Sequence, residues 1–185
     1  MKLKKYLSVF VCLVTMTAML TSCGGKKEFR NTSWGASLSS VTKSEDTEYV
    51  FASDDIIYFN DKMFDVDSEI LYSFKDSALV EAQSKFLVSE WVLEDIIANY
   101  KEVAAQLTEK YGKPLNDNYQ VWKTDSDKYE EYKNDTEFNA MYWKILEFKY
   151  EWKTESSYYS LSLNYKDEQI NYVFYGCPVE SAPVN

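Results

Sequence analysis

Carboxyl groups are the side chains of this sequence that are abundant and close enough together to suggest catalysis. Two carboxyl groups hydrolyse a glycosidic bond only when they face each other across a cleft. Adjacent residues of a strand point to opposite faces, and those of a helix lie about 100° apart. A chain with 30 acidic residues contains such pairs by chance, and we interpret them as exposed surface. The pairs are Asp54/Asp55, Asp65/Asp67, Glu94/Asp95 and Glu130/Glu131.

Residue types needed for other common kinds of catalysis are missing. The chain has no His, which excludes Ser-His-Asp and Cys-His catalysis, HExxH zinc sites and an imidazole base. No GxxxxGK[ST], GxGxxG or GxSxG pattern occurs. Residues 61–67 (DKMFDVD) lack the frame of a calcium loop and predict a turn between strands. We therefore predict no enzyme activity, no catalytic residue, no cofactor and no metal site.

The chain is strongly acidic once its first residues are set aside. Its formal net charge is −10, from 20 basic and 30 acidic residues. Residues 1–22 contain three Lys and no acid, so the remainder has 17 basic and 30 acidic residues and a net charge of −13. Such a body repels nucleic-acid phosphates and anionic lipid head groups, and we expect no nucleic-acid partner.

The N-terminus has the features of a bacterial secretion signal in their usual order. Three Lys in residues 2–5 precede an apolar stretch, residues 6–20, which is too short for a comfortable membrane span. Residues 20–23 (LTSC) resemble the lipobox of bacterial lipoproteins. The resemblance implies that residues 1–22 are removed and that Cys23 is lipidated and becomes the first residue. The alternative is an ordinary secretory signal in which Cys23 is incidental.

Lipidation at Cys23 would fix the protein to the cell envelope. Three acyl chains, at roughly 0.8 kcal/mol per buried CH₂, make an anchor that is effectively permanent. Residues 23–28 form the anchor and a tether, flexible at its two Gly. No Asp follows Cys23, which in the lipoprotein family indicates the outer membrane of a Gram-negative-type bacterium; its periplasmic and surface faces both remain open. Cys177 is then the single remaining thiol, interpreted as a small buried apolar residue.

Hydrophobic periodicity predicts one helix followed by four strands, twice. Ser37 begins a short helix to about Glu45, and Ser89 begins a long one with apolar residues at three- and four-residue steps, ended by Gly112 and Pro114. Strands are expected at residues 48–52, 56–60, 69–75, 78–88, 119–124, 141–153, 158–165 and 170–175. Residues 125–136 are predicted to be a loop or weak helix.

The predicted fold class is α+β. Strand alternation is one-sided, which is typical of an antiparallel sheet with one covered face. We expect two tandem units, residues 29–88 and 89–178, with the helices packed on one face of the sheet. Residues 179–185 are expected to be a loose tail.

Two short segments add a resemblance. Residues 34–41 (WGASLSSV) resemble the opening of many small bacterial lipoproteins, and residues 111–114 (YGKP), before Trp122, resemble their helix-to-strand connection. Both are similar to the β-lactamase-inhibitory proteins and to the small lipoprotein of the barrel-assembly machinery. The resemblance implies a helical layer on an antiparallel sheet, sometimes in tandem, and a protein-binding surface.

Aromatic residues are the remaining candidates for function, at 17% of the chain. Tyr and Trp stack on sugar rings and anchor protein interfaces, although most aromatic residues simply fill a core. Tyr129, Tyr132, Trp143 and Tyr158 are the candidates expected on the exposed side. We therefore predict a lipid-anchored module that binds an envelope protein; the alternative is a module that binds a glycan or small ligand through these rings.

Overall fold

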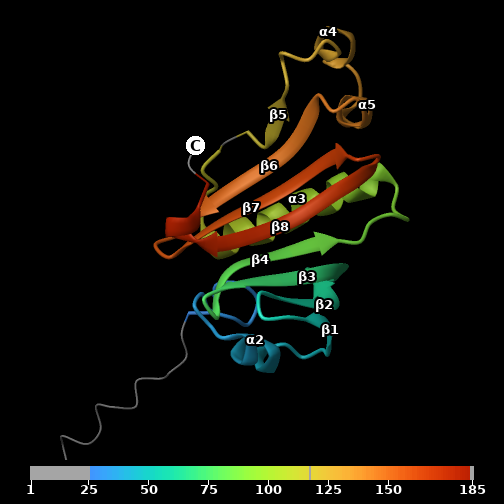
Figure 1. Cartoon of the computed structure of the whole chain (residues 1–185). Coiled ribbons are helices and arrows are strands. Elements are labelled where there is room, and N and C mark those ends of the chain that lie inside the picture. Colours follow the sequence, from blue (N-terminus) through green and yellow to red (C-terminus); the bar gives the residue numbers. More distant parts are fainter. Residues whose placement is uncertain (1–25, 117, 184–185) are drawn as a thin grey trace, which may run out of the picture.

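The protein is built on one antiparallel sheet of eight strands. The computed structural model describes residues 26–116 and 118–183; the predicted secretion signal, Cys23 and the two Gly of the predicted tether lie outside them. The strand order is β1-β2-β3-β4-β8-β7-β6-β5 (Figure 1). The strands are β1 (Tyr49–Ala52), β2 (Ile56–Met63), β3 (Val66–Lys75), β4 (Ala78–Phe86), β5 (Gln120–Trp122), β6 (Leu146–Lys153), β7 (Ser157–Lys166) and β8 (Gln169–Pro178).

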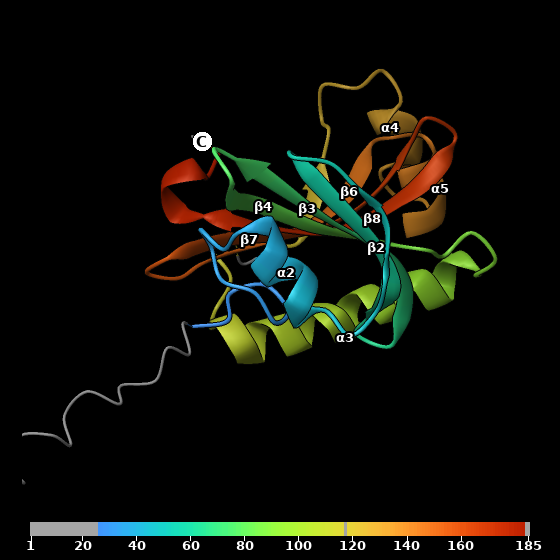
Figure 2. The same ribbon diagram turned by 60° about the horizontal axis from the view of Figure 1, so that its bottom comes forward.

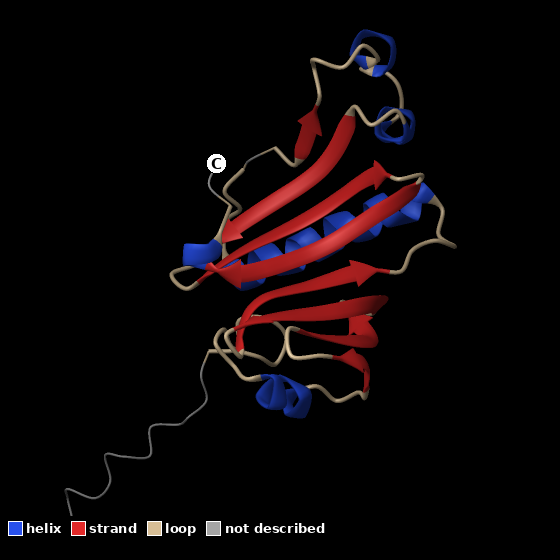
Figure 3. Ribbon diagram, in the orientation of Figure 1, coloured by secondary structure: helices blue, strands red, loops and turns tan. Residues whose placement is uncertain are grey.

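Helices cover one face of this sheet. The long helix α3 (Leu93–Tyr111) runs across that face (Figure 2), and α2 (Leu38–Ser44) lies near β1 and β2 (Figure 3). The predicted inner face of α3 is confirmed, because its apolar residues are buried in the core, Tyr111 partly. Val41 of α2 joins the same core. The fold is therefore mixed α and β, with more residues in strands than in helices.

The N-terminal segment is part of the core. Phe29 is completely buried, and its ring stacks on Phe174 of β8 with centroids 5.2 Å apart. Trp34 Nε1 donates a hydrogen bond to Ser157 Oγ at 2.7 Å. The ordered domain therefore begins within a few residues of the predicted tether.

Tight turns join the strands of each half of the sheet. Phe64 and Asp65, Asp76 and Ser77, and Asp167 and Glu168 all have positive φ. Two such residues in succession form the turn whose twist matches a two-residue hairpin. The prediction of a turn between strands within residues 61–67 is confirmed, with its two loop residues at positions 64 and 65.

Several predicted boundaries are wrong. The strand predicted at residues 69–75 begins at Val66, and the one predicted at residues 78–88 ends at Phe86. The strand expected at residues 141–153 begins at Leu146, because residues before it form helix α5 (Glu137–Tyr142). Thr136 caps α5 by accepting from the Asn139 N–H, and the helix buries Ala140 and Met141. Helix α3 begins at Leu93 rather than at Ser89, since residues 89–91 form a turn and Val92 is extended. Residues 125–136, predicted to be a loop or weak helix, form turns around one short helix, α4 (Tyr129–Tyr132).

The predicted tail is ordered at its start. After β8 the chain makes a short 3₁₀ turn, η1 (Val179–Ser181), and the Val179 N–H donates to the Ser156 C=O at 3.0 Å. In the part of the chain that the structure describes, no helix is long and apolar enough to cross a membrane.

Candidate binding groove

The seam between β4 and β8 is closed at one end and open at the other. The two strands pair only through Ala82–Lys85 and Val173–Gly176. At one end of the seam, the Gly35 N–H donates to the Leu79 C=O and the Leu79 N–H to the Ala36 C=O, both at 2.9 Å. At the other end the strands diverge (Figure 1). There, residues 169–172 of β8 have partners in β7 alone.

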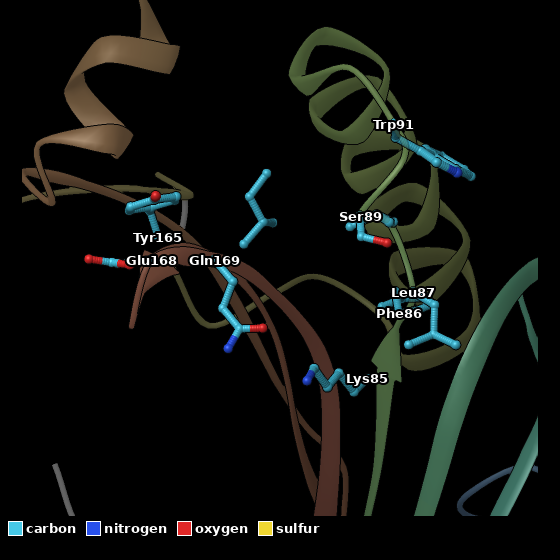
Figure 4. Close-up of a pocket in the computed structure, with 10 residues that line it drawn as sticks. Lys85, Phe86, Leu87, Ser89, Trp91, Tyr165, Glu168 and Gln169 are labelled. Atoms are coloured by element: carbon cyan, nitrogen blue, oxygen red, sulfur yellow. The ribbon is translucent and has the colours of Figure 1, made fainter.

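A hollow of about 370 Å³ occupies the open end of the seam. This volume is within the range of small ligand sites. Figure 4 shows Tyr165, Glu168 and Gln169 together on one side of the hollow and the segment that leads from β4 to α3 on the other; the side chains of Leu87 and Trp91 extend from that segment on the side away from Tyr165. The lining residues are Lys85, Phe86, Leu87, Val88, Ser89, Trp91, Tyr165, Glu168, Gln169 and Ile170. We call this hollow the seam groove.

One wall of the seam groove is the segment that leads from β4 to α3. The Leu87 N–H donates to the Asp67 C=O at 2.8 Å, and the Trp91 N–H donates to the Val88 C=O at 3.1 Å. Val88 is buried and fixes the segment to the core, while Leu87 and Trp91 remain 43% and 40% exposed. The backbone bonds therefore hold two large apolar side chains at the surface.

The other wall continues into a second, more open hollow. That hollow, about 600 Å³, is lined by Tyr142, Trp143, Lys144, Tyr165 and Glu168. Tyr165 and Glu168 line both hollows, so the two are continuous across the β7–β8 turn. The ring centroids of Tyr142 and Tyr165 lie 5.2 Å apart. The resulting surface runs from the start of α3 to α5.

A cluster of aromatic rings lies next to the second hollow. Tyr132 and Trp143 stack with ring centroids 5.1 Å apart and an interplanar angle of 26°. Lys128 Nζ lies 5.3 Å from the Trp143 centroid and 6.0 Å from that of Tyr132. A hydrogen bond to Glu131 and the charge of that carboxylate raise the pKa of Lys128, which keeps the amine charged beside the rings.

The structure gathers three of the four aromatic residues that the sequence singles out. Tyr132 and Trp143 stack directly, and Tyr129 lies in the same helix as Tyr132. Tyr129 packs against the edge of Trp122, with centroids 6.2 Å apart. Of the three, Trp143 is the one that lines a hollow.

Tyr158 is separate from this group, and the expectation that it is exposed is wrong. Its side chain is 5% exposed, and its hydroxyl donates to the Glu151 carboxylate. Burial, together with this carboxylate, raises the pKa of Tyr158. The physical reason is that η1 folds back beside the start of β7, an arrangement that the strand alternation does not reveal.

Sequence reasoning missed the residues that form the seam groove. Leu87, Trp91, Tyr165 and Ile170 were assigned to strands or to a helix start, not to a site. One signal was present: residues 86–88 (FLV) are three consecutive apolar residues, which breaks the alternation of a half-buried strand. The middle residue of such a run must point away from the core.

The carboxylates and the one thiol of the described residues do not form a reactive site. Within residues 26–116 and 118–183, no three Cys, Asp or Glu side chains are grouped to hold a metal ion. Cys177 is 1% exposed, and burial raises the pKa of its thiol.

No protein-family model, curated protein or solved structure matches the chain.

Proposed function

We propose that the chain is a lipid-anchored cell-envelope protein that binds another protein in the seam groove and has no enzymatic activity. The observation that carries this proposal is the open end of the β4–β8 seam, where Leu87 and Trp91 are held at the surface beside an unpaired stretch of strand. Exposed apolar side chains that surround a concave surface are typical of protein interaction sites.

The position of the groove relative to the N-terminus supports this assignment. The C=O of Glu28 accepts hydrogen bonds from Tyr111, the last residue of α3, whereas Trp91 lies just before its first residue. A helix of 19 residues is about 28 Å long. With lipid at Cys23, the tether leaves one end of the domain and the groove lies at the other. The groove would therefore face away from the outer membrane, whichever side the body occupies.

A glycan or another small ligand is the second candidate. It is favoured by the exposure of Tyr142 and Trp143, which lie beside each other at the second hollow. Flat rings of this kind can stack on sugar rings. However, Tyr132 and Lys128 already occupy part of the faces of Trp143. The seam groove, which offers both apolar side chains and strand edge, favours the protein ligand.

We also propose that the domain consists of two tandem units, residues 29–88 and 89–178. Two features support this division. Each segment begins with a helix and contains four strands that pair in sequence order, although α4 and α5 separate β5 from β6 in the second segment. The two groups of strands meet at a single pair, β4 with β8, which is also where the seam groove opens.

Site-specific photo-crosslinking in intact cells tests the protein ligand. A photo-reactive phenylalanine analogue at Trp91 should give a discrete adduct with one envelope protein. The matched control is the same analogue at Leu115, which is also exposed and apolar but follows the opposite end of α3. The substitution Leu87→Asp should remove the Trp91 adduct without unfolding the protein, since Leu87 is at the surface.

The outcome is interpretable in both directions. The same adducts from positions 91 and 115, or an adduct that survives Leu87→Asp, would contradict binding in the seam groove. An adduct specific to position 91 should be followed by purification of the crosslinked protein and measurement of its affinity for the wild-type and Leu87→Asp chains.

A further inference from the structure

The edge of β8 in the seam groove carries backbone groups that β7 does not use. Asp167 and Glu168 form a two-residue loop, so Lys166 and Gln169 are its closing pair. In such a hairpin the closing pair is hydrogen-bonded, and alternate residues then direct their N–H and C=O groups to the opposite side. Ile170 is the next residue, so its N–H and C=O point away from β7 and into the groove that its side chain also lines.

The closed end of the seam shows what kind of segment fits there. Gly35 and Ala36 belong to an irregular stretch of chain, yet they exchange two backbone hydrogen bonds with Leu79 of β4. This turn, in which Gly35 has a positive φ, bonds to β4 beyond the last residue that pairs with β8. The open end has the corresponding gap but no segment of the described chain within it.

The shape of the groove limits the occupant to a single extended segment. The β4–α3 connection bounds the groove on the side opposite Ile170. A strand that belongs to another sheet has a neighbouring strand about 4.8 Å from it, and that neighbour would collide with the β4–α3 connection. A second copy of this chain that entered through a strand of its own sheet is therefore excluded as an occupant.

We propose that the partner enters the seam groove as an extended peptide segment that adds a short strand to β8 beside Ile170. Backbone hydrogen bonds to Ile170 hold the segment, and an apolar side chain of the segment packs between Tyr165 and the β4–α3 connection. Strand addition of this kind takes its affinity from the main chain and its specificity from alternate side chains. This inference rests on the proposed function, because it describes how a protein partner occupies the same groove.

A peptide library tests this mode of binding. The probe is a phage-displayed library of random 12-residue peptides, selected on the full chain in detergent and counter-selected on the Trp91→Ala variant. Selected peptides are then synthesised with one N-methyl group at each backbone position in turn. N-methylation removes a donor, and the proposed bonds need one peptide N–H, which donates to the Ile170 C=O. Strand addition therefore predicts a loss of affinity, roughly fivefold to tenfold, at one backbone position, with the other positions unaffected.

The possible outcomes separate this inference from the function on which it rests. Sensitivity to N-methylation at one backbone position, with slower hydrogen exchange at the Ile170 amide in the complex, supports strand addition. Peptides that need Trp91 but tolerate N-methylation at every position would overturn strand addition and leave protein binding in the groove intact. If the selection yields no peptide that prefers the wild-type chain over Trp91→Ala, both proposals are overturned, and glycan binding at the same residues replaces them.

Discussion

The hydroxyls of Tyr111 and Tyr159 donate to the same acceptor, the C=O of Glu28, at 3.1 and 2.8 Å. Their rings stack with centroids 3.9 Å apart. The pair therefore ties the first residues of the domain to both α3 and β7. Phe29 follows directly and inserts into the core, so the N-terminal segment is part of the folded structure and not merely a linker.

Removing the Phe29 ring should strongly destabilise the protein. Phe29→Ala deletes a fully buried ring and leaves a cavity, which costs about 3–5 kcal/mol in the free energy of unfolding. The measurement is chemical denaturation followed by far-UV circular dichroism. The control, Phe51→Ala, removes a ring that is 52% exposed and should change stability by less than about 0.5 kcal/mol. Equal effects of the two substitutions would contradict the core position of Phe29.

Arg30 makes the next attachment of this segment and predicts a dependence on pH. Its guanidinium pairs with Asp61 of β2 and lies 2.9 Å from the Glu45 carboxylate, which also accepts from the Tyr72 hydroxyl. Burial alone would raise the pKa of Asp61. The hydrogen bonds from the Lys62 backbone and from Arg30, together with the Arg30 charge, lower it overall.

A lowered pKa in the folded state means that the unfolded chain takes up the proton first. Stability from Asp61 is thus complete above the ordinary Asp pKa, about 3.9, and is lost as pH falls through the lower folded value. We expect the melting temperature of Asp61→Asn to approach that of the wild type as pH falls. The control is Asp54→Asn, which replaces an exposed carboxylate. Its melting temperature should differ from that of the wild type by the same amount at every pH. Parallel curves for both variants would contradict this role of Asp61.

The sequence predicts local features of this fold well where one signal dominates. Every three- and four-residue apolar step of α3 points inward, because the helix has a single core-facing side. The hairpin turn at Phe64 and Asp65 follows from the short polar segment between apolar runs. The predicted strand at residues 141–145 is wrong because apolar residues 138, 141 and 142 also fit helical spacing, and Thr136 supplies a cap.

The candidate site depends on long-range relationships that no local pattern contains. The seam groove exists because β8 begins at Gln169, four residues before Val173, the first of its residues that pairs with β4. The strands β4 and β8 lie far apart in the sequence. The burial of Tyr158 depends on η1, which follows β8. The alternation of β7 therefore gives the face on which a side chain lies, but not what covers that face.

Cys177 should be inert in the folded protein. It is 1% exposed, and its pKa is raised chiefly by burial, so little thiolate is present and reagents have little access. We expect a thiol reagent at about pH 7.5 to modify it only after denaturant is added, since its ordinary pKa is about 8.5. Mass spectrometry of the treated chain locates the modification. Rapid modification in the native state would contradict its burial.

Lipidation distinguishes the two remaining cysteines of the predicted mature chain. Cells grown with an alkyne analogue of palmitate should incorporate the label into the wild type and into Cys177→Ser. Cys23→Ser should lose the label, because the predicted acceptor sulfur is gone, and should be released from the membrane fraction. Gel fluorescence after coupling of a dye measures the incorporation. Label retained in Cys23→Ser would contradict lipid attachment at Cys23 and leave an ordinary secretory signal.

Paired Trp substitutions distinguish the protein ligand from the glycan ligand. Trp91 belongs to the seam groove and Trp143 to the second hollow, and each is 40% exposed, so replacing either by Ala should leave the fold intact. Protein binding predicts that Trp91→Ala weakens the partner by at least about tenfold, since a central Trp anchor contributes about 2 kcal/mol or more. It also predicts that Trp143→Ala has a smaller effect, because Trp143 lies beside the groove. Glycan binding reverses this order, and a glycan array probed with both variants and the wild type shows which order holds.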